Sequence, residues 1–340
     1  AGTTGSNSVY IGIDNGGNAN NVTVLDREGR YLVERMLEVP SRVLEGPEMA
    51  VTAMVEALHL GLGHAQRPIS AVRAVGLDTP GPASALGVLS SLGSTNFSTA
   101  AWRGFDIRSA LEAALDLPVV YSNDGNAAAL YAHHAHFGAL AAERSSVSAI
   151  VGTGLGGGVI EGGRIIAGAS GMGGELGHVH IPMAGLLEPG QPIPTCNCGF
   201  TGDVESVASL TGIEKNLLPF WLGRHPDHEL ASVDLRTAAK RVRGLAERRD
   251  PLAISIFEQQ AKALGHLFTL AANFIDPDAF FIGGGVVEAA PEFRDWFLDT
   301  VRSHTTLRIE QSRTTEFALV PDLDMAGARG SALAAMSQFR

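Results

Sequence analysis

One stretch of sequence decides the fold: Tyr121-Ser122-Asn123-Asp124-Gly125-Asn126-Ala127-Ala128-Ala129-Leu130. Just before it, residues 118–121 predict a short buried strand, because apolar residues follow a proline that can open a strand. The alanine run that begins at Ala127 predicts a helix. Asn123 and Asp124 are therefore expected at the carboxyl end of a strand, where α/β sheets bind ligands. Capping of the helix by Asp124 or Asn126 is the alternative.

Composition bounds the class of protein. The chain has 340 residues, enough for two domains of ordinary size. Its hydrophobic share of 45% and charged share of 18% are typical of a globular protein, and a net charge of -11 disfavours a nucleic-acid partner. The uncharged run 79–102 is rich in Ser, Gly and Pro, which predicts a loop and not a membrane span. Two closely spaced cysteines favour a cytoplasmic location.

Glycines gather in turns that follow apolar strands. The first turn follows strand 9–14 and contains Gly16 and Gly17, whose backbone amides can approach a phosphate, while Asp14 can hold Mg²⁺ through water. A plain hairpin turn is the alternative. The second turn, 152–158, is neither a Walker loop nor a dinucleotide fingerprint, because a strand over 159–166 follows it. Two such loops predict a duplicated architecture that clamps one polyphosphate.

Three further stretches suggest ligands. The loop 79–102 contains Asn96, whose amide can bind a sugar hydroxyl or satisfy local backbone groups. Gly283-Gly284-Gly285 follows a buried strand and leaves room for a flat adenine or ribose. A soft, zinc-like ligand set is formed by His178, Cys196, Cys198 and Asp203. Free thiols beside a histidine bonded to backbone are the alternative to zinc.

Taken in chain order, the motifs resemble those of the ROK family of bacterial sugar kinases. The motifs are Asp14-x-Gly16-Gly17, Asn123-Asp124-x-Asn126, Gly152-Thr153-Gly154-x-Gly156-Gly157-Gly158, Glu175-x-Gly177-His178, Cys196-x-Cys198-Gly199-x-x-Gly202-x-x-Glu205 and Gly283-Gly284-Gly285. The resemblance extends from about Val9 to the terminal helix expected over 327–336. It implies an actin-like, ribonuclease-H-like ATPase fold with two α/β domains and a sugar cleft between them. A small domain would comprise 9–123 plus 324–340, and a large domain 124–323.

The resemblance also implies a role for each motif. Asp124 matches the catalytic base. The sugar-binding positions are Asn96, Asn123, Asp124, Glu175, His178 and Glu205. The ATP-binding positions are Asp14, Gly16, Gly17, Asn18, Thr153, Gly154, Gly283, Gly284 and Gly285. The zinc ligands are His178, Cys196 and Cys198, with Asp203 in place of the family's third cysteine. Asn18 replaces the family's usual threonine, so that an amide takes the place of a hydroxyl contact to phosphate.

These observations predict ATP-dependent phosphorylation of the primary hydroxyl of a hexose, with Mg²⁺ as cofactor, a structural Zn²⁺ in the cysteine loop and a homodimer as the family's assembly. Glucose is the first candidate substrate, because all three of the family's sugar-binding residues Glu175, His178 and Glu205 are present. N-acetylhexosamines, mannose, fructose and a sugar-like cyclitol are the alternative substrates, and polyphosphate is the alternative donor. A non-catalytic sugar-binding regulator, which Asn18 suggests, is the alternative of another class. A DNA-binding regulator is disfavoured, because the first strand is expected from Val9 without room for a helix-turn-helix.

Overall fold

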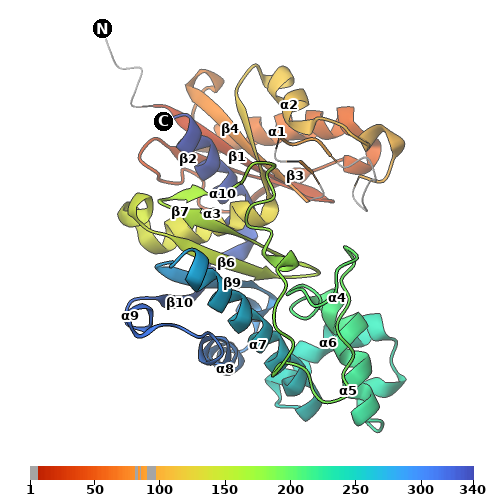
Figure 1. The fold of residues 1–340 in the computed structure, drawn as a ribbon. Helices are drawn as coiled ribbons and strands as arrows, with labels where there is room; N and C mark the ends of the chain where they lie inside the picture. The colour runs from red at the N-terminus through yellow and green to blue at the C-terminus, as the bar shows by residue number, and fades with distance from the viewer. Residues whose placement is uncertain (1–6, 81–82, 85, 90–96) are drawn as a thin grey trace. The chain divides into compact units, whose positions relative to one another are not determined.

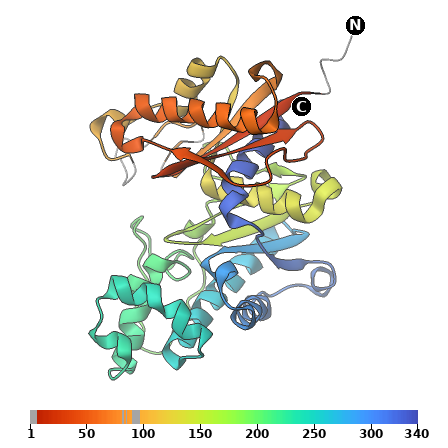
Figure 2. The same cartoon turned by 180° about the vertical axis from the view of Figure 1, so that it is seen from behind.

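The structure is a computed structural model that describes residues 7–80, 83–84, 86–89 and 97–340. The predicted sugar ligand Asn96 lies outside the described residues. The chain divides into two compact units, each built on its own sheet (Figure 1; Figure 2). Unit 1 comprises the chain up to Ala142 with Gly163–Gly174 and Asp322–Arg340, and unit 2 comprises Glu143–Gly162 and Glu175–Pro321. No helix among the described residues is long and apolar enough to cross a membrane.

Unit 1 is a sheet with helices on both faces. Its elements are β1 (Val9–Asn15), β2 (Ala19–Asp26), β3 (Leu37–Pro40), α1 (Pro47–Ala65), β4 (Val72–Thr79), α2 (Ile107–Leu115), β5 (Val119–Asn123), α3 (Asp124–Phe137) and α10 (Leu323–Gln338), with short 3₁₀ turns at Val43–Glu45, Ile69–Ala71, Ala100–Trp102 and Gly138–Glu143. The strand order is β3-β2-β1-β4-β5. β1 is antiparallel to β2 and parallel to β4, and β4 is parallel to β5.

Side chains alternate between the two faces of the sheet along β1, and each face packs against a different layer of helices. Ile11 and Ile13 are fully buried in the core that β1 shares with α1 and α2. Gly12 points the other way, and a Cβ atom there would overlap the carbonyl oxygen of Ala328 in α10. A glycine is therefore required in β1, because the backbone of α10 lies directly on this face of the sheet.

The two compact units divide the chain at other points than the predicted domains, because unit 1 also includes α3 and Gly163–Gly174, which were expected in the large domain. The sequence predicted that the large domain would begin at Asp124, whereas unit 1 continues to Ala142 and includes α3. α3 packs along α10, and a Cβ atom at Gly330 would overlap the carbonyl oxygen of Ala127. This backbone-to-backbone contact holds α3 within unit 1.

Unit 2 repeats the plan of unit 1. Its elements are β6 (Ser146–Val151), β7 (Leu155–Glu161), η5 (Leu176–His178), α4 (Leu210–Gly212), a π-helical turn (Ile213–Leu217), α5 (Leu218–Arg224), η7 (Glu229–Ser232), α6 (Leu235–Glu247), α7 (Pro251–Phe274), β9 (Ala279–Gly284), η8 (Gly285–Glu288), α8 (Pro291–Ser303), α9 (Ile309–Ser312) and β10 (Glu316–Leu319). The order of this sheet is β10-β9-β6-β7-β8, and its last strand, β8 (Arg164–Ile165), comes from the segment Gly163–Gly174 that is grouped with unit 1.

The two sheets share one topology, which confirms the predicted duplication. Each begins with an antiparallel hairpin, β1–β2 in one and β6–β7 in the other. Each then adds strands parallel to the first strand of its hairpin, β4 and β5 or β9 and β10. In both sheets a tight turn rich in glycine therefore joins the first two strands.

The second glycine turn is shorter than the sequence suggested. The predicted turn ran from Gly152 to Gly158, but β7 begins at Leu155, so the last three glycines lie within the strand. Gly157 has φ 146°, and a Cβ atom there would overlap the carbonyl oxygen of Ser148 on β6. At this position glycine is required by packing between strands, and only 152–154 remain as the loop.

Candidate active site

Acidic side chains stand at the carboxyl ends of neighbouring strands in unit 1. Asp14 on β1 pairs in register with Asp78 on β4, and Asp78 pairs with Ser122 on β5. Asp124 directly follows Asn123, the last residue of β5, and is the first residue of α3. Because these strands are parallel, their carboxyl ends lie at one edge of the sheet, where a ligand and a metal ion can be held.

Asp78 also belongs to this group of acids at strand ends, and the sequence motifs did not predict it. It is fully buried, and its Oδ2 accepts a hydrogen bond from Ser331 Oγ at 2.9 Å. Burial and the adjacent carboxylate of Asp14 raise the pKa of Asp78 well above its ordinary value of 3.8. The sequence held one signal for it: Asp78 directly follows the apolar run Ala74-Val75-Gly76-Leu77, much as Asp14 ends the apolar run of the first strand.

Replacing Asp78 by Asn is expected to stabilise the protein at neutral pH by about 1–3 kcal/mol, the usual cost of an unsatisfied buried polar group. The Asn side chain still accepts from Ser331 Oγ, and its amide can donate to Asp14. The folded pKa of Asp78 is raised, so the folded protein keeps a proton that the unfolded chain releases. Wild-type stability is therefore lost as pH rises from about 3.8 towards the folded pKa.

Thermal melting of both proteins between pH 4 and 8 measures this effect. The advantage of Asp78→Asn should be smallest near pH 4, where the unfolded chain has released only part of this proton, and should grow with pH. Asp227→Asn, which changes an exposed acid of unit 2, is the matched control and should leave the profile unchanged. A variant that melts below the wild type at pH 8 would contradict the burial argument.

Asn123 caps α3, which leaves Asp124 for another role. The side-chain oxygen of Asn123 accepts from the backbone N–H of Asn126 at 2.7 Å. The helix N-terminus is thus satisfied by the residue before Asp124, and neither Asp124 nor Asn126 is its N-cap. Asp124 is exposed, and its Oδ1 accepts from the N–H of Gly125 at 2.8 Å. The carboxylate therefore lies at the positive end of the helix dipole.

The first glycine loop is a tight turn at the end of the β1–β2 hairpin. The N–H of Gly16 donates to Ala19 O at 2.9 Å, which places Gly17 and Asn18 at the tip. Asn18 is exposed, and its backbone carbonyl accepts from Ser41 N at 2.9 Å. Close to this loop, a Cβ atom at Gly327 of α10 would come 2.7 Å from the carboxylate of Asp14. Glycine at 327 therefore leaves space for the Asp14 side chain.

The second glycine loop lies in unit 2 and is held at both ends. The N–H of Gly152 donates to Gly154 O at 2.9 Å, while Gly152 O accepts from Leu210 N at 2.9 Å. Thr153 is exposed at the tip of the turn. This loop forms one wall of a cavity. The cavity is lined by Thr153, Gly154, Thr195, Cys196, Asn197, Glu205, Ser206, Ser209, Thr211 and Gly212.

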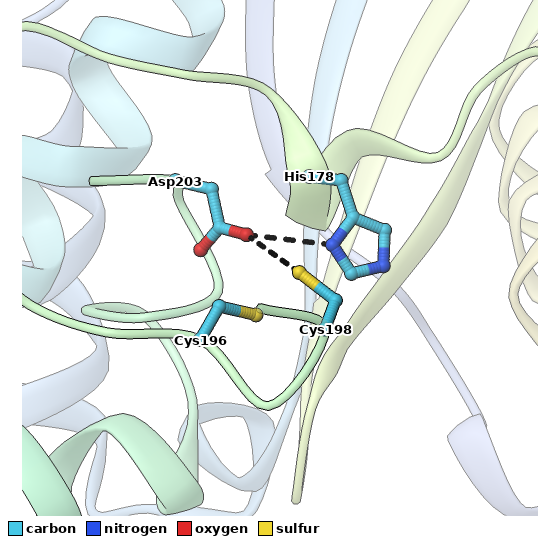
Figure 3. A group of neighbouring side chains, drawn as sticks. All are labelled: His178, Cys196, Cys198 and Asp203. Carbon is cyan, nitrogen blue, oxygen red and sulfur yellow. Dashed lines mark hydrogen bonds and ion pairs between the residues drawn. The ribbon is translucent and has the colours of Figure 1, made fainter. Parts of the chain in front are cut away.

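The four predicted metal ligands converge in unit 2. Figure 3 shows the side chains of His178, Cys196, Cys198 and Asp203 pointing toward one another. Their ligand atoms all lie within 4.8 Å of one another, and Asp203 Oδ2 lies 3.4 Å from His178 Nδ1 and 3.6 Å from Cys198 Sγ. Asp203 is fully buried and its Oδ1 also accepts from Ser206 N at 2.9 Å. Burial raises the pKa of the Cys196 thiol, so a metal ion would have to displace that proton.

The three glycines predicted to lie against adenosine, Gly283, Gly284 and Gly285, make packing contacts or hydrogen bonds with other residues of unit 2. A Cβ atom at Gly283 would come 2.8 Å from Ile150 Cδ1, and Gly284 has φ 109° with no room beside Val151 O. Gly285 O accepts from Arg243 Nη1 at 2.6 Å. Packing within unit 2 therefore accounts for glycine at 283 and 284, and adenosine binding there stays a prediction.

The structure brings the predicted residues together in two sets. Unit 1 carries Asp14, Gly16, Gly17, Asn18, Asn123 and Asp124, with Asp78 as the addition. Unit 2 carries Thr153, Gly154, Glu175, His178, Cys196, Cys198, Asp203, Glu205, Gly283, Gly284 and Gly285. Glu175 is exposed at the start of η5, and His178 ends that turn.

Comparison with known proteins gives consistent matches along the chain. The sequence profile of the ROK family matches residues 10–338. The glucokinase of Halalkalibacterium halodurans is 32% identical over 302 residues, covering 87% of this chain and 84% of that protein. An N-acetylmannosamine kinase of Escherichia coli is 30% identical over 277 residues, covering 81% of this chain and 82% of that protein.

Solved structures agree. A ROK hexokinase from Thermus thermophilus has a TM-score of 0.76 and 31% identity, with 97% of this chain and 98% of that chain covered. A glucokinase from Streptomyces griseus, solved in complex with glucose and AMPPNP, has a TM-score of 0.66 and 26% identity, with 97% of this chain and all of that chain (100%) covered. Both similarities extend over the two units.

Proposed function

The chain belongs to the ROK family, and from this premise we propose that it transfers the γ-phosphoryl group of ATP to the primary hydroxyl of a hexose. It is a sugar kinase with the actin-like, ribonuclease-H-like ATPase fold that the sequence predicted. One observation carries the proposed chemistry: Asp124 is an exposed carboxylate at the N-terminus of a helix that Asn123 caps. Such an acid can accept the proton of an attacking hydroxyl.

The remaining residues align the reactants, which is most of what phosphoryl transfer requires. Asp14 would hold Mg²⁺ through water, and the ion would neutralise charge on the phosphates. The amides of Gly16, Gly17 and Gly154 would contact phosphate oxygens, with Asn18 and Thr153 adding side-chain donors. Asn123 uses its oxygen for the helix cap, which leaves its amide N–H groups to donate to a sugar.

Glucose is the proposed acceptor, and Glu175, His178 and Glu205 would bind its hydroxyls together with Asn96 and Asn123. The similarity to glucokinases supports glucose, while the similarity to an N-acetylmannosamine kinase supports an N-acetylhexosamine. Mannose, fructose and a cyclitol are further candidates. A coupled assay of ADP release with each sugar, with ATP or polyphosphate as donor, identifies both substrates. If no sugar or cyclitol releases ADP, the alternative of a non-catalytic regulator is favoured. A cytoplasmic location and a homodimer remain predictions.

The cysteine loop fits a zinc ion. Two thiols, an imidazole and a carboxylate are the ligand types that Zn²⁺ prefers, and here they already converge. The buried carboxylate of Asp203 also lacks a lysine or arginine partner among the ion pairs of the described residues, so a cation would offset the cost of its burial. We propose that His178, Cys196, Cys198 and Asp203 hold Zn²⁺, which would fix the loop that carries Glu205.

Adding Zn²⁺ to chelator-treated protein is expected to raise its melting temperature, because the ion binds only the folded loop. Asp203→Asn keeps the bond from Ser206 N but loses the charged ligand, so its zinc affinity should fall by at least about tenfold. Competition with a chromophoric chelator measures that affinity, and Glu188→Gln, an acid outside the cluster, is the control. Elemental analysis showing below about one-tenth equivalent of zinc, with melting unchanged by Zn²⁺, would refute the site.

A further inference from the structure

Both oxygens of the Glu205 carboxylate are bonded within unit 2. Oε1 accepts from the backbone N–H of Leu155 at 2.8 Å, and Oε2 accepts from Sγ of the protonated Cys196 thiol at 3.3 Å. Zinc binding by Cys196 would remove the second bond and leave the first. Leu155 is the first residue of β7 and directly follows Gly154 of the second glycine loop. The backbone N–H of Glu205 donates to Gly177 O at 2.9 Å. Glu205 therefore links the glycine loop, the cysteine loop and the η5 turn.

The fit around this carboxylate is close. A Cβ atom at Gly154 would come 2.6 Å from Glu205 Oε1, so the glycine makes room for the acid. A Cβ atom at Gly177 would come 3.3 Å from the same oxygen and 2.6 Å from Leu155 O. Two glycines from separate motifs thus admit one side chain. Residues 154 and 177 are glycines because a side chain at either position would collide with Glu205 or with Leu155 O.

A carboxylate in this position has an electrostatic cost for phosphate binding. It lies beside Gly154, whose loop is proposed to contact the phosphates, and like charges at short range repel. It also occupies the Leu155 N–H, which phosphate could otherwise use. This cost is offset because Glu205 fixes the glycine loop before the nucleotide binds, and a preorganised site loses less entropy on binding.

Resting on the proposed function, we propose that Glu205 is a positioning residue for the nucleotide: its bond to Leu155 N–H fixes the second phosphate loop. The same side chain is proposed to bind a sugar hydroxyl. One carboxylate then serves both substrates, so that sugar at Glu205 alters nucleotide affinity and nucleotide alters sugar affinity by the same factor. A residue used for sugar alone would affect only the sugar.

Calorimetric titration with Mg·AMPPNP in the absence of sugar tests the proposal. Glu205→Ala removes the acceptor for Leu155 N–H, so the dissociation constant for the nucleotide should rise about tenfold, the usual worth of a charge-assisted hydrogen bond. Glu205→Gln keeps an oxygen acceptor and removes the repelling charge. Its nucleotide dissociation constant should stay within about twofold of the wild type or fall. Both variants should bind glucose more weakly.

Glu175→Gln is the matched control. Glu175 is also a proposed sugar-binding carboxylate of unit 2, and within the described part of the chain its side chain has no hydrogen bond to the glycine loop. This variant should lose glucose affinity without any change for AMPPNP. Amide hydrogen exchange at Leu155 gives a second readout, with protection kept in Glu205→Gln and lost in Glu205→Ala.

Failure of the inference and failure of the proposed function look different. Wild-type affinity for AMPPNP in Glu205→Ala, or unchanged protection of its Leu155 amide, would overturn the role of Glu205 in the loop. A wild-type protein that binds no AMPPNP would overturn the proposed function, and hydrogen exchange at Leu155 would still decide whether Glu205 fixes the loop. Melting curves establish that each variant is folded before it is titrated.

Discussion

An Asp124→Asn protein is expected to fold like the wild type and to lose about 10²- to 10⁴-fold in turnover, the usual loss when a general base is removed. Folding should persist because the helix cap belongs to Asn123, whose oxygen accepts from Asn126 N. Asn at 124 also keeps an oxygen that can accept from Gly125 N. The charge that this substitution removes at the helix N-terminus is worth about 0.3–1 kcal/mol.

Sugar-dependent ADP release measures the loss, and calorimetry with Mg·AMPPNP checks that the nucleotide site survives. Asp234→Asn is the control, since it makes the same change at the N-terminus of α6, where Asp234 caps Thr237 N and Asn caps equally well. The control should retain wild-type turnover. If Asp124→Asn also turns over at the wild-type rate, Asp124 is not the base and the proposed mechanism is wrong.

Much of this site follows from local sequence. Apolar runs followed by polar or glycine residues predicted where strands end, and Asp14 and Asp124 do stand at strand ends in unit 1. The family resemblance implied that Cys196, Cys198 and His178 belong to one ligand set, and the structure brings these side chains together. The positions of the two acids depend on neighbours in sequence and on the parallel register of adjacent strands.

Other features depend on contacts that no local pattern contains. Asp78 is buried because α10, more than 240 residues later, places Ser331 against it (|i−j| = 253). The choice between Asn123 and Asp124 as helix cap depends on backbone geometry at two adjacent polar residues, either of which caps well. Gly157 was assigned to a turn, but its φ and its contact with Ser148 O place it inside β7. The site could not be predicted further from sequence, because these features depend on contacts between residues far apart in the chain and on backbone torsion angles.

The terminal helix α10 supplies the distant contact to Asp78, and Gly330→Ala is expected to show the importance of the packing of this helix. A Cβ atom at Gly330 would overlap Ala127 O on α3, a backbone atom that cannot move without its helix. Alanine favours a helix over glycine by about 1 kcal/mol, yet overpacking costs about 1–3 kcal/mol or more. Because the obstacle is backbone, we expect a cost near the upper end of this range and a net loss of about 2 kcal/mol.

Urea denaturation of Gly330→Ala measures that loss, with Gly63→Ala as the control. Gly63 is an exposed residue of α1 with no atom within 4 Å of a built Cβ, so alanine there should stabilise by about 0.5–1 kcal/mol. Moving α3 also moves Asp124 at its first turn, so Gly330→Ala should lose turnover under conditions where it is still folded. A Gly330→Ala protein as stable and as active as the wild type would show that α10 does not position the catalytic acid.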